Sequence, residues 1–328
     1  MTIQAERSGV TTTDGVRLNV EIIGPDDAPV TVLLVHGWTC STRSWHHQVE
    51  GLPRILGPDA VRIVTYDHRG HGRSGAGPVG SQRIEQLADD LITVLDTVVG
   101  DGPVVYAGHS MGGMTLMALA DQRPELFGSR IAAAALVSTT SGQASSGAFG
   151  IPNRFDSAAA AFAPRAVNLV GARVERRAQR AGLTTRRVVS SRRAFELAAA
   201  RLQRPALRQI VFGKKVDPAE VDLFLEDLAV VPGPSYGGFF EAILRHDRGH
   251  ALKVLDQLPV EIMHGTRDRL QFLYSGIEGG AGHAAEDVPL EVAADGRALG
   301  FLAEEILEGA DGHHGRHNPR ACAAARVC

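Results

Sequence analysis

A serine flanked by glycines lies between two apolar segments of the chain. Residues 103–107 form a short apolar run with β-branched members, typical of a buried strand, and residues 114–120 are typical of a helix packed on a sheet. Between them, residues 108–112 read Gly-His-Ser-Met-Gly, the Gly-x-Ser-x-Gly pattern of a nucleophile elbow. A strand that turns so sharply into a helix leaves no room for larger side chains beside the serine. We therefore predict that Ser110 is a nucleophile, held above a helix N-terminus that favours developing negative charge.

A carboxylate follows a later strand. Asp268 comes soon after the alternating segment 258–263, which predicts a strand. At the carboxyl end of such a strand, on the same rim as the elbow, an acid can orient a catalytic imidazole. A serine hydroxyl is a weak nucleophile until a neutral imidazole accepts its proton, and the acid holds that ring in the productive tautomer. Ser110 and Asp268 therefore require a histidine as the third catalytic residue.

Strands and helices that could position these residues are spread along the chain. The other predicted strands are 16–23, 30–35, 61–66 and 131–137, and the other predicted helices are 44–56 and 81–99. The first strand alternates and is expected at an antiparallel edge, whereas the continuous apolar strands are expected to be buried on both faces. Ser81 is expected to open its helix, with Glu85 close by. Trp45 is interpreted as a core residue.

The segment His36-Gly37-Trp38 follows a buried strand directly. A glycine at that point lets the backbone bend close to a ligand, so the Trp38 amide is expected to face the space above Ser110. His36 and His109 are expected to pack beside the site.

The loop 67–75 is dense in charge and glycine. We interpret it as a rigid turn that shapes the floor of the site, in which an Asp and an Arg of the loop pair with each other. His68 and His71 lie in this loop, but no third ligand at metal-site spacing accompanies them, so no metal site and no cofactor are expected.

A change of composition predicts two units. Residues 141–250 lack strand runs, and residues 141–216 hold fifteen Lys and Arg against three Asp and Glu, a net charge of +12. We predict a core formed by 1–140 and 251–310, a helical cap or lid over 141–250, and a disordered tail over 311–328. The basic cap segment is either a solvated helical face or an attractor for anionic or lipid-like substrates.

Composition limits the possible partners and the compartment. The chain has 328 residues, 44% of them hydrophobic, and a net charge of −3, which argues against a nucleic-acid or membrane partner. Its three cysteines, Cys40, Cys322 and Cys328, suit a reducing compartment. We see no signal peptide and no apolar run of the roughly eighteen residues that span a bilayer, so a cytoplasmic location is expected. The oligomeric state cannot be read from the sequence.

The motifs above together resemble those of the α/β-hydrolase superfamily, specifically its lidded esterase- and lipase-like serine hydrolases. The resemblance runs from Val16 to Asp268. It implies an α/β fold with a mostly parallel central sheet flanked by helices and a helical cap insertion. It also implies that Ser110 is the nucleophile, that Asp268 is the acid, and that the backbone amides of Trp38 and Met111 form the oxyanion hole.

The histidine departs from the family pattern. His283, in Gly280-Ala281-Gly282-His283, is similar to the family's terminal histidine loop, but it follows Asp268 by only fifteen residues. A crossover helix and a returning strand are hard to fit into that interval. A strand at 289–293 would instead put Arg297 at the expected spacing. Three possibilities stay open: His283 is the base, His313 or His314 is the base, or a competent base is missing.

These features predict a serine hydrolase that cleaves small or lipid-like carboxylic esters through an acyl-serine intermediate. Perhydrolase, lactonase and thioesterase chemistry on the same site remain alternatives. The non-catalytic alternative is a ligand-binding homologue that lacks the base. The predicted partner is therefore a small-molecule ester.

Overall fold

The computed structural model describes residues 5–142, 212 and 216–263 of the chain. Its strands are β1 (Glu6–Thr11), β2 (Arg17–Ile23), β3 (Val30–Val35), β4 (Val61–Tyr66), β5 (Val104–His109), β6 (Ile131–Val137) and β7 (Val260–Met263). Its α-helices are α1 (His46–Leu56), α2 (Ile84–Val94), α3 (Met111–Gln122), α6 (Pro218–Val230), α7 (Gly233–Leu244) and α8 (Leu252–Leu255). Shorter helical turns are η1 (Thr42–Trp45), η2 (Leu95–Val99), η3 (Pro124–Leu126) and η5 (Gly249–Ala251).

The described strands form a seven-stranded sheet in the order β1-β2-β4-β3-β5-β6-β7. The pairs β1-β2 and β2-β4 are antiparallel and the other pairs are parallel, so the predicted mostly parallel sheet is confirmed. The edge position predicted for 16–23 is wrong, because β2 lies between β1 and β4. The sequence gives little sign of β1, since Val10 is its only buried residue and no apolar alternation marks it.

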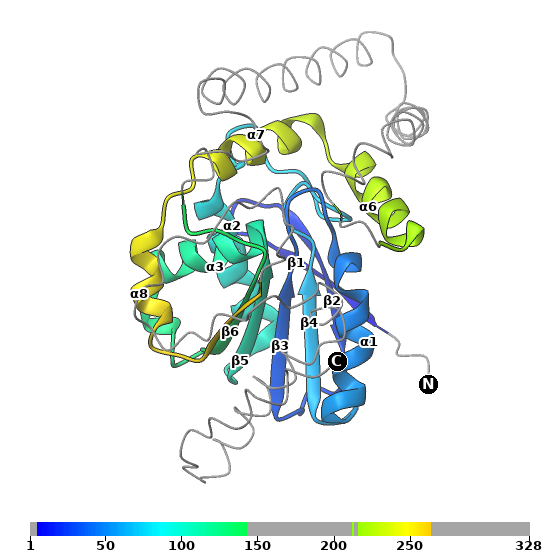
Figure 1. Ribbon diagram of the computed structural model, residues 1–328, viewed down its shortest axis with the longest axis vertical. Helices are drawn as coiled ribbons and strands as arrows, with labels where there is room; N and C mark the ends of the chain where they lie inside the picture. The colour runs from blue at the N-terminus through cyan, green and yellow to red at the C-terminus, as the bar shows by residue number, and fades with distance from the viewer. Residues whose placement is uncertain (1–4, 143–211, 213–215, 264–328) are drawn as a thin grey trace.

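Helices cover both faces of the sheet (Figure 1). All six residues of β3 are buried, and they alternate between two apolar clusters. Leu33 and Val35 pack in the cluster that contains residues of α2, α3 and α8, whereas Val32 and Leu34 pack in the cluster that contains α1 residues. Trp45 is buried in the second cluster, which confirms its interpretation as a core residue.

One predicted helix boundary is wrong. The helix predicted over 81–99 begins at Ile84 as α2, and Arg83 precedes it without a side-chain cap. The Ser81 amide instead donates to the Pro78 carbonyl at 3.0 Å, so Ser81 belongs to a turn. The helix predicted over 44–56 is present as η1 followed by α1.

Helices α6 and α7 lie at the carboxyl end of the parallel strands (Figure 1). Small residues let α7 sit directly on the loops below it, because a Cβ on Gly70 would lie 2.2 Å from Ser235 Oγ. One turn further along the same helix, a Cβ on Gly238 would lie 2.6 Å from Gln82 Cβ. Among the described helices, none combines the length and apolar character that crossing a membrane requires.

The loop 67–75 is tied together by Asp67. Its buried carboxylate accepts the backbone N–H groups of Thr42 and Arg73, each at 2.8 Å, and the side-chain amide of Asn19 at 3.0 Å. One carboxylate thus joins the loops after β3 and β4 to strand β2. The rigid turn expected from the sequence is present.

The arginine of that loop has its partners outside it. The fully buried Arg69 guanidinium donates to both oxygens of Asp90 on α2 at 2.6 Å, and to Asp14 in the β1–β2 turn at 2.7 and 3.0 Å. The Arg69 side chain is therefore not paired within the loop, and the Asp–Arg contact inside the loop is the bond from the Arg73 amide to Asp67. A planar guanidinium offers donors in several directions, so one carboxylate does not satisfy it once it is buried.

We predict that Asp90→Asn lowers the free energy of unfolding by about 3 kcal/mol or more, because it leaves the Arg69 charge buried against a neutral amide. Asp14→Asn is the matched control, since Asp14 touches the same guanidinium but is 32% exposed. Its loss should be smaller, because water can replace part of the lost interaction. Urea unfolding measures both variants. A loss for Asp90→Asn no greater than that for Asp14→Asn would contradict this account.

Candidate active site

Ser110 occupies the turn between β5 and α3. Its backbone is in a left-handed, strained conformation with φ 50° and ψ −111°, which costs about 1–3 kcal/mol in a residue other than glycine. Its amide donates to the Val137 carbonyl at 2.9 Å, and the residue is half-buried. The sharp turn predicted for 108–112 is therefore present.

The glycines of the turn are required by close backbone contacts. A Cβ on Gly108 would lie 2.6 Å from the Gly113 nitrogen, and a Cβ on Gly112 would lie 2.3 Å from the Val35 carbonyl oxygen. Both distances are shorter than real Cβ contacts, and the opposing atoms are backbone that cannot turn aside. Glycine at these positions lets α3 begin directly against the end of β3.

The loop after β3 passes beside the serine. A Cβ on Gly37 would lie 3.1 Å from Ser110 Cβ and 2.7 Å from His109 Nδ1. The next residue in the chain is Trp38. On the other side of the serine, Met111 is the first residue of α3, where backbone N–H groups have no partner within the helix. The two residues predicted to supply the oxyanion hole therefore both adjoin the Ser110 turn.

Two side-chain hydroxyls hold the Ser110 turn in place. The Tyr106 hydroxyl donates to the Gly112 carbonyl at 2.8 Å, and the Thr139 hydroxyl donates to the Ser110 carbonyl at 2.7 Å. Burial raises the pKa of Tyr106 well above its usual value, so the phenol keeps the proton that it donates. These bonds hold the first turn of α3 in register with β5 and β6.

An aromatic cluster from α7 covers the loop after β3. The Trp38 ring lies 4.6 Å from the Tyr236 ring and 5.1 Å from the Phe240 ring, centroid to centroid. Its indole N–H donates to the Tyr236 carbonyl at 3.2 Å. This cluster was not predicted from the sequence, although Tyr236 and Phe240 are four residues apart and hence on one face of a helix.

Three buried histidines, His36, His68 and His71, pack against one another at the start of this loop and in the loop after β4. His36 Nε2 accepts the backbone N–H of His68 at 2.9 Å, and its Nδ1 donates to the Gly37 carbonyl at 2.7 Å. Both nitrogens are thus committed, and the 4.0 Å approach of His36 to Asp67 is no ion pair. Burial lowers the pKa of His36 to about 4 and that of His71 to about 3, and it lowers the pKa of His68 well below its usual value. His36 is therefore a packing residue, as expected.

Asp268 and His283 lie outside the described residues, as do the alternatives His313, His314 and Arg297 and the basic segment up to residue 211. The strand that precedes Asp268 is described. β7 pairs in parallel with β6, which pairs in parallel with β5, and the register aligns Met263 with Val137 and Val137 with His109. The chain thus leaves β7 on the same rim of the sheet as Ser110.

The neutral histidines predict acid sensitivity. Unfolded histidine has a pKa near 6.5, so below that pH the unfolded chain binds more protons than the folded chain. Their contribution to stability is complete above pH 6.5 and is lost as the pH falls toward their folded pKa values.

The variant His71→Asn tests this. It removes the titrating ring and keeps an N–H donor for the Arg69 carbonyl, which His71 Nδ1 contacts at 3.1 Å. Between pH 7 and pH 5 we expect the free energy of unfolding to fall by about 2 kcal/mol less in the variant than in the wild type. Urea unfolding across this pH range measures the difference, and identical pH profiles would contradict it.

Comparison with known proteins agrees with this architecture. A sequence model of the alpha/beta hydrolase fold family matches residues 30–275. Lipase LipV of Mycobacterium tuberculosis is 41% identical over 109 residues, which cover 33% of this chain and 38% of the lipase. A bifunctional esterase/perhydrolase of Acinetobacter calcoaceticus is 38% identical over 104 residues, 32% of this chain and 35% of that protein. The chain thus aligns with little more than a third of the length of these relatives.

The fold comparison covers more of the chain. The crystal structure of an enol-lactonase from Burkholderia xenovorans superposes with a TM-score of 0.59, and the match covers 92% of this chain and 99% of that one at 21% identity. At that identity the likeness concerns the fold alone. Because the family match spans most of the sequence, the chain belongs to the α/β hydrolase fold family.

Proposed function

We propose that this protein is a serine hydrolase that cleaves carboxylic esters through an acyl group on Ser110. The observation that carries the proposal is the strained, half-buried Ser110 at the N-terminus of α3, with the Gly37 backbone directly beside it. Esterase and lipase names among the relatives support ester chemistry at the level of the family.

In this proposal the Ser110 oxygen attacks the carbonyl carbon of the ester while an imidazole takes the hydroxyl proton. The carbonyl oxygen becomes an oxyanion, and the backbone amides of Trp38 and Met111 stabilise it, by roughly 3–4 kcal/mol for each donor. The intermediate collapses, and the imidazolium returns its proton to the departing alcohol. Water then attacks the acyl-serine by the same steps and releases the carboxylic acid.

Asp268 and His283 are the proposed acid and base. Support for Asp268 comes from its position soon after β7, which ends on the same rim as β5. Support for His283 comes only from its likeness to the family's histidine loop. His313 and His314 remain the alternatives.

The substrate is proposed to be a small or lipid-like ester with an apolar acyl or aryl group. The wall formed by Trp38, Tyr236 and Phe240 beside the predicted oxyanion hole supports this choice, because flat aromatic rings favour apolar groups. We propose that residues 141–250 act as the cap, with α7 as its inner face. Attraction of anionic esters by its basic part belongs to the same proposal.

Perhydrolysis is a second candidate. The likeness to the esterase/perhydrolase of Acinetobacter calcoaceticus favours it. In that reaction hydrogen peroxide replaces water as the nucleophile that releases the acyl group, and the product is a peracid. It uses the same acyl-serine and therefore the same Ser110.

We predict that the wild-type chain hydrolyses p-nitrophenyl esters and that Ser110→Ala lowers kcat by about 10⁴-fold or more, because the acyl group then has no acceptor. The matched control is Ser129→Ala, which changes an exposed serine whose hydroxyl bonds only the local Glu125 carbonyl among the described residues. It should keep full activity. A series of acyl lengths in the same assay reports the preferred acyl group.

The same assay locates the base. His283→Ala should abolish turnover if His283 accepts the Ser110 proton, whereas loss in His313→Ala or His314→Ala would assign the base to the tail. No turnover of any ester by the wild type, together with saturable binding of an apolar ligand, would contradict the hydrolase proposal and favour a binding protein.

A further inference from the structure

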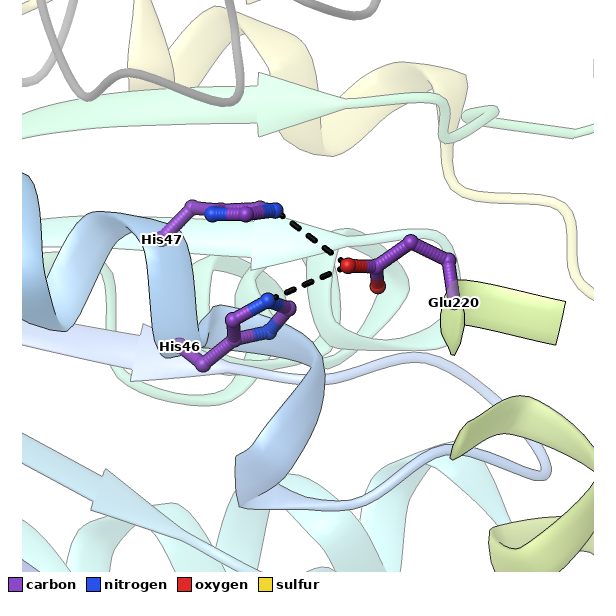
Figure 2. Close-up of side chains that lie close together, drawn as sticks. All are labelled: His46, His47 and Glu220. Carbon is purple, nitrogen blue, oxygen red and sulfur yellow. Dashed lines mark ion pairs between the residues drawn. The ribbon is translucent and has the colours of Figure 1, made fainter. Parts of the chain in front are cut away.

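We propose that His46, His47 and Glu220 form a binding site for a divalent transition-metal ion such as Zn²⁺, separate from the Ser110 site. The two histidines open helix α1 of the core, and Glu220 lies in the first turn of α6. Figure 2 shows both imidazoles directed at the carboxylate between them. An ion bound here would join α1 to α6.

The spacing of the ligand atoms suits such an ion. His46 Nε2 lies 3.2 Å and His47 Nε2 lies 3.3 Å from the same oxygen, Glu220 Oε1, and the three ligand atoms all lie within 4.8 Å of one another. Nitrogen and oxygen ligands bind Zn²⁺ at about 2.0–2.2 Å, which in a tetrahedron puts neighbouring ligand atoms roughly 3.3 Å apart. Three protein ligands leave the fourth position for water.

The hydrogen bonding of His46 leaves its Nε2 able to bind a metal. His46 Nδ1 lies 2.9 Å from the Arg43 carbonyl oxygen, which can only accept, so Nδ1 carries the proton. In the neutral ring Nε2 then holds a lone pair directed at the Glu220 oxygen, and the contact becomes attractive when a proton on Nε2 or a metal ion lies between the two atoms. A backbone carbonyl that orients the imidazole in this way is the usual second partner of a metal-binding histidine.

A metal ion satisfies this arrangement better than protons on both rings. The ring centroids of His46 and His47 are 3.9 Å apart, so two positively charged rings would repel each other. Two neutral rings and one carboxylate can instead share a single divalent ion. Imidazole and carboxylate ligands in this combination are typical of Zn²⁺ and its neighbours rather than of Ca²⁺ or Mg²⁺.

The two elements that carry the ligands are already held together by other contacts. Asp227 of α6 accepts hydrogen bonds from the Ser41 hydroxyl at 2.7 Å and from the Arg43 guanidinium, both of which lie just before α1. The side chains of His46 and Glu220 remain 35% and 30% exposed. The site is therefore in place before the ion arrives and can be reached from solvent.

Isothermal titration of ZnCl₂ into the metal-stripped chain of 328 residues tests the proposal. Because the sequence also holds His313, His314 and His317, the titration is made in a chain where these three are changed to glutamine. We expect one Zn²⁺ per chain in this background. His47→Gln and Glu220→Asp should each weaken Zn²⁺ binding at least about tenfold. Glu220→Asp keeps the negative charge but moves the carboxylate away from the two imidazoles. His250→Gln, at an exposed histidine elsewhere, should leave the affinity unchanged.

Thermal unfolding gives a second readout. Zn²⁺ should raise the unfolding midpoint of the chain and should raise it much less in Glu220→Asp, because an ion that binds only the folded chain stabilises it. In EDTA the two should unfold at similar temperatures, which shows that the variant is folded. Zn²⁺ affinity that is the same with and without Glu220→Asp, or that disappears with the three tail histidines, would overturn the proposal.

Discussion

The site depends on a backbone contact between the end of β3 and the start of α3. A Cβ on Gly112 would lie 2.3 Å from the Val35 carbonyl oxygen, and one on Gly37 would lie 3.1 Å from Ser110 Cβ. At these distances the two segments can meet only where side chains are missing. The contact brings the loop after β3, the strained serine and the first amide of α3 into one small volume, and the Tyr106 and Thr139 hydroxyls hold it.

Around this contact the loops at the rim are fixed by buried charges and neutral histidines. Asp67 joins the loops after β3 and β4, and Arg69 joins the second of these loops to α2 and to the β1–β2 turn. Both ring nitrogens of His36 bond to the backbone, so the chain is held in place directly before Gly37. Helix α7 then packs on this platform through Ser235 and Trp38. The strained backbone conformation of Ser110 persists because the contacts around it hold the turn in place.

Much of this arrangement could be predicted from local sequence, and the reasons for the failures are physical. Buried strands such as β3 and the 108–112 turn follow from apolar runs and from glycines that no other residue can replace. Strand β1 could not be predicted, since Val10 is its only buried residue. The partners of Arg69 and the approach of Glu220 to His46 were also missed, because pairings between residues far apart in the chain leave no local pattern. Asp268 and His283 remain predictions, since both lie outside the described residues.

The most direct test of the central claim, that the Ser110 hydroxyl is a nucleophile, is mass spectrometry of the folded chain after reaction with a fluorophosphonate. Digestion and peptide mapping locate the adduct. The account predicts one phosphonyl group per chain, carried by the Ser110 oxygen and prevented when an ester substrate is present in excess. An unmodified Ser110 in a folded chain, or an adduct confined to another residue, would contradict it.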